Sequence, residues 1–556
     1  MTDAADRLLI NGAVHTLTEP DTVHEAVAIR DGEIVRLGDT YEIEFLEGVE
    51  TDVIDCEGRV VLPGFIDAHT HVENTGRFLV HADLSDATGS EGCVERLSAR
   101  ADETDGEWIQ GFGYDESEWE GDDRAYLTRE HLDRVSTERP VVALRIDMHA
   151  ASLNSVALER LADDLPEGDV RRSEATGEPT GVVVEDAAET VRSHISPGYD
   201  ETLDLVTAGL EHAASTGVTA VHDMVRNSRS PRVYRDLEAA GDLPTRVRIN
   251  YWIDHLESVL EVGLTTNGGS DRVQTGAIKT YTDGSIGSRT AKLFEPYEPD
   301  GGGDPDWTTD GVDLDTSGGV GPDPEDSGER SGGSRASSAQ RADGEWVITP
   351  AELEEIVDRV DDAGFQLTAH AIGDAAIEEA LSAFETTSDP GGSRHRIEHV
   401  ELATDEHIER MAEAEIVASM QPNFHQWAGE GGLYDQRLGR ERRSRTNRFR
   451  RVLEAGVPLA FGSDCMPLDP LLGIHHAVNA PTEAQRLSVT EALRAYTRGA
   501  AYAGFDEDRL GTLEVGKRGD LVVLEESPWA ESVRIDEIDV AMTLVDGEIV
   551  FDGRVA

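Results

Sequence analysis

The 556-residue chain is long enough for one large domain and a smaller one, and its 112 acidic against 49 basic residues give a net charge of −63. Such a surface repels nucleic acid and anionic membranes, and no apolar run reaches the ~18 residues of a membrane span, so we expect neither as a partner. Three scattered cysteines argue against a disulfide framework and, with no signal peptide at the N-terminus, favour a cytoplasmic protein.

Both ends of the chain predict short strands joined by tight turns. Residues 8–62 alternate apolar and polar side chains around Asp-Gly turns, and residues 541–553 do the same. The string DGEIV occurs once in each of these two segments. Neither end is expected to bury its apolar face alone. We therefore predict one small β-sandwich domain that is built from both chain termini, residues 1–62 and 508–556.

Between these ends, strand patterns alternate with amphipathic helical patterns such as 375–384 and 405–414, which indicates a parallel sheet. Eight strands of this kind predict an α/β fold, a (β/α)8 TIM-like barrel over residues 63–507. The eight expected strands are residues 60–67, 218–224, 246–253, 276–284, 365–373, 394–400, 415–423 and 458–464.

Two long segments interrupt this alternation. Residues 73–216 lie between the first two expected strands and carry strand patterns of their own, so we interpret them as an insertion. Residues 299–344 are rich in Gly, Ser and Asp and have almost no apolar side chains. That composition predicts a disordered, acidic surface loop.

Side chains that can bind a metal or move a proton lie at the ends of five expected strands. His69 and His71, in GFIDAHTHV, are two residues apart and point to the same side of an extended strand, where a divalent metal is the simplest partner. Any one of these side chains alone is better explained by packing or exposure to water. The carboxyl ends of barrel strands meet at one mouth, so we expect the whole set to converge there. The set is His69, His71, Lys279, His370, His399 and Asp464.

Several motifs resemble those of a known group of enzymes. PGFIDAHTHV, the strand lysine, TAHAIGD, RIEH, and FGSD followed by GTLEVGKRGDLVVL resemble the amidohydrolase superfamily of metal-dependent hydrolases. GFGYDESEW, TGVVVEDA and KTYTDGSIGSRTA resemble the amidohydrolase family 3 branch, which includes N-substituted formamide deformylases. The resemblance covers nearly the whole chain outside residues 299–344, and it does not name a substrate.

The resemblance implies a site with two divalent metal ions. His69 and His71 would bind the first metal, and His370 and His399 the second. Zinc is the first choice, with iron, nickel or manganese as alternatives, because neutral imidazole suits these ions. Asp464 would ligate the first metal and contact the water between the two.

Lys279 would bridge both metals as a carbamate, because an ammonium group has no lone pair to donate to a metal. The alternative for this lysine is a salt bridge to nearby Asp283. His149, Asn154 and Gln421 match family residues near the pocket, which makes them candidates for contact with the substrate.

The expected reaction is hydrolysis of a non-peptide C–N bond in a small amide, formamide or cyclic amide. A hydroxide held between the metals would attack the carbonyl, and Asp464 would shuttle the proton to the leaving nitrogen. Two alternatives stay open, a deaminase of a heterocyclic substrate that uses the same site, and a catalytically silent barrel that serves as a scaffold. A homo-oligomer is compatible with the sequence, which does not determine the oligomeric state.

The charge also predicts adaptation to salt. Lysine occurs only at positions 279, 292 and 517, so the other 46 basic residues are arginine, a composition typical of halophilic proteins. In molar salt the screening length falls to about 3 Å, which relieves the repulsion among carboxylates. We therefore expect both folding and activity to need molar KCl or NaCl. Melting temperature and activity measured against KCl concentration check this, and undiminished values in dilute buffer would contradict it.

Overall fold

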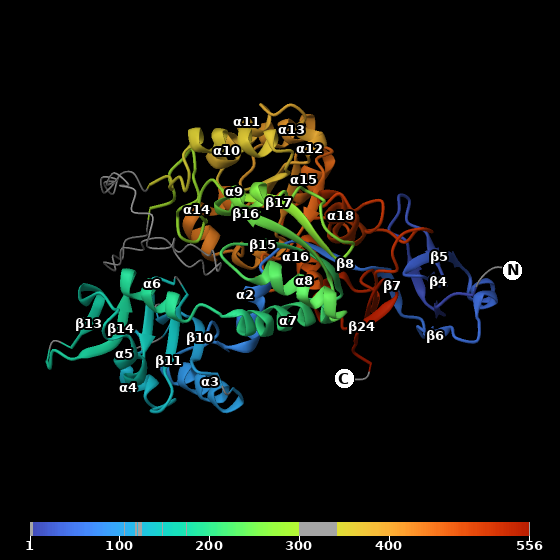
Figure 1. Ribbon diagram of the computed structural model, residues 1–556. Coiled ribbons are helices and arrows are strands. Elements are labelled where there is room, and N and C mark those ends of the chain that lie inside the picture. Colours follow the sequence, from blue (N-terminus) through green and yellow to red (C-terminus); the bar gives the residue numbers. More distant parts are fainter. Residues whose placement is uncertain are drawn as a thin grey trace.

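A computed structural model describes residues 4–554 except 105, 117–118, 120–124, 147, 174 and 300–341. Figure 1 shows a central barrel between a pair of small sheets that contains the N-terminus and a separate α/β unit. The expected loop 299–344 lies almost wholly outside the described residues. Its last residues are packed, because Ala342 and Asp343 accept backbone hydrogen bonds of 2.8 Å from Tyr297 and Leu293.

Eight parallel strands form the barrel and pair with one another in chain order, which confirms the predicted fold class. A backbone hydrogen bond of 2.7 Å from Asp464 to His69 joins the end of the last strand to the first. The strands are β8 (Phe65–Thr70), β15 (Val218–Val225), β16 (Arg246–Trp252), β17 (Val273–Tyr281), β18 (Leu367–Ala371), β19 (Arg396–His399), β20 (Val417–Met420) and β21 (Leu459–Phe461).

The first expected strand, 60–67, is wrong as a single element because the chain changes sheets at Gly64. Residues Val60–Pro63 form β7, which pairs antiparallel with β22 (Leu521–Leu524) outside the barrel. The backbone N–H of Gly64 donates to Asp520, whereas that of Phe65 donates to Gly217 beside the barrel strand β15. A Cβ at position 64 would lie 2.2 Å from the Thr219 side chain, so this crossing needs a glycine.

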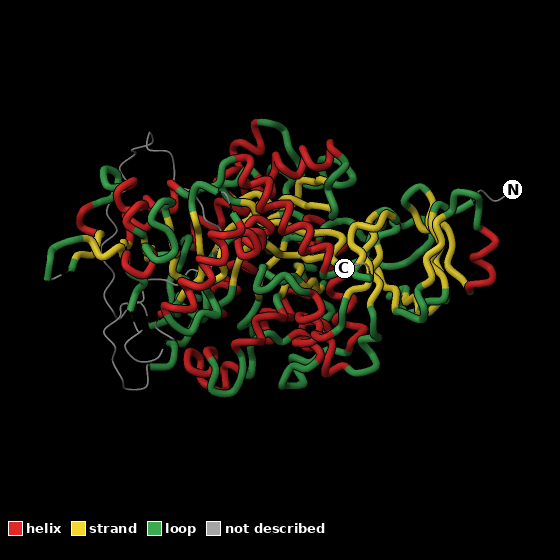
Figure 2. Tube along the Cα trace, turned by 90° about the horizontal axis from the view of Figure 1, so that it is seen from below, coloured by secondary structure: helices red, strands yellow, loops and turns green. Residues whose placement is uncertain are grey.

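Both chain ends contribute to two small sheets that share one hydrophobic core. The core contains Leu9, Ile29 and Val61 from the N-terminal part and Leu521 and Leu544 from the C-terminal part, as the predicted sandwich requires. The two sheets lie at one end of the molecule in Figure 2. Their strand orders are β24-β23-β22-β7-β2-β3 and β5-β4-β1-β6. The remaining strands are β1 (Arg7–Ile10), β2 (Ala13–His15), β3 (Val23–His24), β4 (Ala26–Arg30), β5 (Glu33–Gly38), β6 (Asp52–Asp55), β23 (Val540–Val545) and β24 (Glu548–Asp552).

The stretch 73–216 contains a six-stranded sheet with its own helices, the separate unit at the lower left of Figure 1. The helices that frame this stretch, α2 (Val72–Val80) and α7 (Tyr199–Ser215), pack closely on each other. A Cβ at Gly76 would lie 1.9 Å from the Leu205 carbonyl oxygen. The unit contains β9 (Ala82–Asp83), β10 (Ile109–Tyr114), β11 (Val141–Arg145), β12 (Ala150–Leu153), β13 (Val170–Arg172), β14 (Pro179–Val184), α3 (Ser90–Glu103), α4 (Arg129–Leu132), α5 (Ser155–Leu161) and α6 (Glu185–His194).

Amphipathic helices cover the outside of the barrel (Figure 1). Their starts follow from side-chain caps: Thr349 and Thr404 each form a capping box with the residue three positions on. In the described part of the chain, none of the helices combines the length and apolar character that a membrane crossing needs. The helices are α8 (Ser230–Ala240), α9 (Leu256–Glu261), α10 (Pro350–Asp362), α11 (Asp374–Phe384), α12 (Pro390–Ser393), α13 (Asp405–Glu413), α14 (Leu433–Arg443), α15 (Phe449–Glu454), α16 (Pro470–Val478), α17 (Val489–Arg494) and α18 (Ala500–Ala503).

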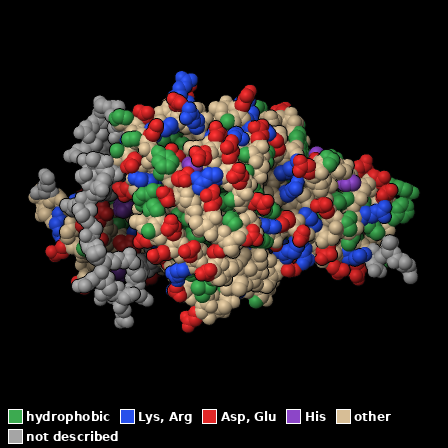
Figure 3. Space-filling model, turned by 90° about the horizontal axis from the view of Figure 1, so that it is seen from above, with side chains coloured by type: hydrophobic (Ala, Val, Ile, Leu, Met, Phe, Trp, Pro, Cys, Tyr) green, Lys and Arg blue, Asp and Glu red, His purple; other side chains and the backbone are tan. Residues whose placement is uncertain are grey.

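Acidic side chains are dispersed over the molecule. On the face that Figure 3 shows, they lie among arginines across the barrel and the terminal sheets without forming one patch. Many of them form ion pairs with arginine, such as Glu491 with Arg450 and Glu385 with Arg410. The distribution agrees with a charge that is spread along the sequence.

Candidate metal centre

Two imidazoles at the end of β8 point into the barrel mouth. The Nδ1 atom of His71 lies 3.1 Å from the Met224 carbonyl oxygen, and that of His69 lies 2.6 Å from Oε2 of Glu398. Both partners only accept hydrogen bonds, so each Nδ1 carries the proton and each Nε2 presents a lone pair. Burial, with Lys279 nearby, lowers the pKa of His69 and keeps its ring neutral.

Asp464, which follows β21, lies opposite these two lone pairs. Its Oδ1 is 3.2 Å from Nε2 of His71 and 3.5 Å from Nε2 of His69. Lone pairs and a carboxylate oxygen at this spacing repel one another unless a cation lies between them. Ligand atoms about 2.1 Å from a tetrahedral zinc ion lie about 3.4 Å apart, so the observed spacing fits a metal.

His399, a member of the second expected ligand pair, lies close to His69 and Asp464. One ligand atom each from His69, His399 and Asp464 lie within 4.8 Å of one another. The Nδ1 atom of His399 is buried and has no hydrogen-bond partner among the described residues. Both His399 and Asp464 have left-handed backbone conformations, with φ of 73° and 54°. Such strain in non-glycine residues is typical of functional sites.

His370, at the end of β18, lies beside His399 with the ring centroids 4.5 Å apart. Its Nε2–H donates to the Gly284 carbonyl oxygen at 3.1 Å, which leaves Nδ1 as the lone-pair atom. Burial, reinforced by the charge of Lys279, lowers the pKa of His370 to about 3. The ring is therefore neutral, the form that binds a metal.

Lys279 lies on β17 in the same mouth. The side chain is fully buried, and its Nζ lies 5.2 Å from the centre of the Tyr281 ring. The two oxygens of Asp283 accept backbone hydrogen bonds from Lys292, Ile372 and Gly373, at 2.7, 3.1 and 2.8 Å. The Asp283 carboxylate thus holds the loops around the mouth, which gives it a role that needs no salt bridge to Lys279.

An ion pair beneath the site, which sequence reasoning did not identify, holds His69 in place. Glu398 is fully buried and accepts from His69 on one oxygen, while its other oxygen lies 2.9 Å from the equally buried Arg396 guanidinium. Burial alone would raise the pKa of Glu398, but Arg396 and His69 hold it well below its usual range. The signal lies in RIEH, where two opposite charges at i and i+2 share one face of a buried strand.

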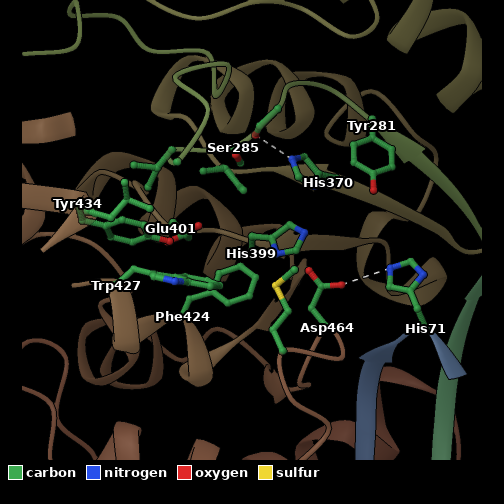
Figure 4. A pocket seen from close by; sticks show the side chains of 16 residues that line it. His71, Tyr281, Ser285, His370, His399, Glu401, Phe424, Trp427, Tyr434 and Asp464 are labelled. Atoms are coloured by element: carbon green, nitrogen blue, oxygen red, sulfur yellow. Dashed lines mark hydrogen bonds and ion pairs between the residues drawn. The ribbon is translucent and has the colours of Figure 1, made fainter. Parts of the chain in front are cut away.

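A pocket leads away from the ligand cluster along an apolar wall. It encloses about 580 Å³, part of it open to solvent, and Figure 4 shows His399 and Asp464 between His71 on one side and the wall on the other. Only Glu401 interrupts the wall with a carboxylate, and burial raises the pKa of this group to about 7. The wall consists of Ile286, Ile372, Phe424, Trp427, Leu433, Tyr434 and Met466.

Of the three candidate substrate residues, the structure brings only Gln421 to the centre. Gln421 follows β20, is fully buried and lies next to His399. Asn154 caps α5, and its side chain bonds the backbone of residues 136, 139, 141 and 157 at 2.8 to 3.0 Å. His149 is exposed in the same unit and lies 3.3 Å from Glu185. None of these three residues lines the pocket that the described residues form.

Comparison with known proteins gives relatives along the whole chain. The sequence pattern of the amidohydrolase family matches residues 52–551. The YtcJ protein of Bacillus subtilis is 29% identical, with 97% of this chain and 98% of that protein covered. An N-substituted formamide deformylase of Arthrobacter pascens is 25% identical, with 99% of each chain covered. The solved structure of an uncharacterised metal-dependent hydrolase of Pyrococcus furiosus has a TM-score of 0.74 and 29% identity, and the match covers 94% of this chain and 99% of that one.

The Glu398–His69 contact predicts a measurable effect on metal affinity. Glu398→Gln keeps the shape but removes the charge that orients His69, so we expect metal affinity to fall about 10- to 100-fold. Competition with a chelator measures the affinity for zinc or manganese, and Glu406→Gln on the exposed surface of α13 is the control. An unchanged affinity in a folded Glu398→Gln variant would show that the contact does not support the metal.

Proposed function

The chain belongs to the amidohydrolase family, and we propose that it hydrolyses a non-peptide C–N bond of a small amide, formamide or cyclic amide. The observation that carries this proposal is the position of Asp464. Its Oδ1 lies 3.2 and 3.5 Å from two imidazole nitrogens, and the residue also lines the pocket. One carboxylate can thus help to hold a metal and also reach a substrate.

The donor set suits a divalent metal, and the Pyrococcus furiosus relative is described as a metal-dependent hydrolase. We propose zinc, with iron, nickel or manganese as alternatives, because the ligands are imidazoles and carboxylates. When bound, such a metal polarises a carbonyl and lowers the pKa of a water molecule toward ~7. His69, His71 and Asp464 would hold one ion, and His370 and His399 the other, with Lys279 between them as a carbamate.

Asp464 is suited to move the proton that hydrolysis requires. Although burial would raise the pKa of its carboxyl, positive charge in the mouth holds this pKa below its ordinary value, so the group starts ionised. It takes a proton from the attacking water and returns it to the leaving nitrogen. The apolar wall beside it excludes bulk water from the substrate, which strengthens the electrostatic interactions within the pocket.

The same proposal includes the setting in which the enzyme works. A net charge of −63 with three lysines supports a protein adapted to molar salt. Cys56 and Cys93 are buried and form no disulfide, which supports a reducing cytoplasm.

The proton-shuttle role predicts that Asp464→Asn retains the fold but loses turnover. Asparagine keeps the size of the side chain but neither accepts the proton nor carries charge, so we expect kcat to fall by at least ~10²-fold. The assay screens formamides, N-acyl amines and cyclic amides in high salt with added zinc or manganese.

Cys465→Ser, at the adjacent position, is the matched control and should turn over normally. Near-normal turnover by Asp464→Asn would refute the shuttle. Release of ammonia from heterocyclic amines, with no hydrolysis of amides, would instead favour the deaminase alternative. A protein that retains no stoichiometric metal would favour the scaffold.

The carbamate role predicts different behaviour for two variants of Lys279. Lys279→Arg keeps the charge but forms no carbamate, so we expect it to lose the second metal and its activity. Lys279→Ala leaves a gap in which acetate or propionate could supply the two missing oxygens, so short carboxylates should partly restore its activity. Metal per chain and activity, measured with and without the carboxylate, check both expectations.

The arginine variant should gain nothing from the carboxylate, because its side chain fills the space. If Lys279→Arg holds two metals and turns over normally, the lysine is structural and the two-metal mechanism is wrong.

A further inference from the structure

Aromatic side chains form a continuous row along the pocket, away from the ligand cluster. The Phe424 ring stacks on His399 with centroids 5.7 Å apart, Trp427 follows at 5.1 Å from Phe424, and Tyr434 follows at 6.4 Å from Trp427. The first two rings belong to the short helical turn Pro422–Trp427 and the third to α14. Figure 4 shows the row on the opposite side of Asp464 from His71. A substrate bound at Asp464 would therefore extend along these rings.

Glu401 lies beside Tyr434, the last ring of this row, and lines the same pocket. Its side chain receives hydrogen bonds from the Tyr434 hydroxyl and from Nδ2 of Asn447, the latter at 3.2 Å. The residue is only 2% exposed, and none of the arginine, lysine or histidine side chains in the described ranges forms an ion pair with it. Its carboxyl group therefore has no basic side chain beside it.

Two other buried carboxylates around the mouth are better satisfied. Glu398 pairs with Arg396, and Asp283 accepts three backbone N–H groups. A cation that joins such a buried carboxyl group favours its ionised form and pairs with it. Because Glu401 borders the empty part of the pocket, a ligand can provide that cation.

We propose, on the basis of the hydrolase function above, that this end of the pocket binds a cationic group of the substrate. An ammonium, including a quaternary one, would contact the Glu401 carboxylate and the faces of Trp427 and Tyr434, which attract cations through their ring quadrupoles. A neutral aromatic or alkyl group would suit the rings but leave Glu401 without a counter-charge. The substrate class is thus an amide or formamide that carries an ammonium group a short apolar linker away from the C–N bond to be cleaved.

The test compares two ligands of the same shape. N-(2-trimethylammonioethyl)formamide and N-(3,3-dimethylbutyl)formamide differ only in a quaternary nitrogen in place of a carbon. We expect the metal-loaded enzyme to prefer the cationic compound in kcat/KM by at least about 10-fold, the size of effect that a desolvated cation–π contact gives. All measurements use one KCl concentration, so that screening is equal.

Two variants assign the preference to this end of the pocket. Glu401→Gln keeps the size and can still accept the Tyr434 hydrogen bond, and the preference should fall toward one. Trp427→Leu, at a half-buried position, should also reduce the preference. This variant provides the test if Glu401→Gln does not fold. Glu406→Gln should leave the preference unchanged. A preference for the cationic compound that survives both Glu401→Gln and Trp427→Leu would overturn the proposal.

Binding separates this inference from the proposed function. Calorimetry of both compounds with the metal-loaded Asp464→Asn variant measures affinity without turnover. If the cationic compound binds more tightly there, and Glu401→Gln removes the difference, the cation site stands even when no amide is hydrolysed. If both compounds bind equally while the wild-type enzyme hydrolyses amides, the cation site is wrong and the hydrolase function stands.

Discussion

The ion pair between Arg396 and Glu398 is the interaction on which the geometry of the site depends. Arg396 also donates to the Ala68 carbonyl at 2.6 Å and to Ser419 at 2.9 Å, so one guanidinium ties β19 to β8 and β20. Glu398 in turn fixes the ring of His69. Two charges buried together are tolerable when they are paired and hydrogen-bonded, and this pairing holds the strand ends in one arrangement.

The electrostatic state of the mouth follows from the same burial. Loss of water lowers the pKa values of His69, His370 and His399, so these rings are neutral and present lone pairs. Buried imidazoles with such low pKa values bind a metal ion more favourably than a proton. The buried ion pair beneath the site thus supports a set of neutral imidazoles that can bind a cation.

Much of this arrangement could be predicted from the sequence, because strand patterns are local and barrel topology brings strand ends together. The eight barrel strands and the clustering of His69, His71, His370, His399, Lys279 and Asp464 belong to this part. The change of sheets at Gly64 could not be predicted, since it depends on Asp520, which is remote in the sequence. Asn154 has a residue type that suits both a pocket and a helix cap, and only the fold distinguishes the two. The environment of Glu401 likewise depends on Tyr434 and Asn447, which other elements place beside it.

The sharing of two sheets by both chain ends has a consequence for biosynthesis. β7 leads directly into the first barrel strand, yet its antiparallel neighbour β22 is made from residues 521–524. While the ribosome is still adding the barrel, the apolar face of β7 has no permanent cover, and closing such a distant contact carries an entropic penalty. The segment that carries His69 and His71 is thus among the first to be synthesised and among the last to be anchored. During that interval the β22-facing edge of β7 is open to pairing with a strand of another molecule.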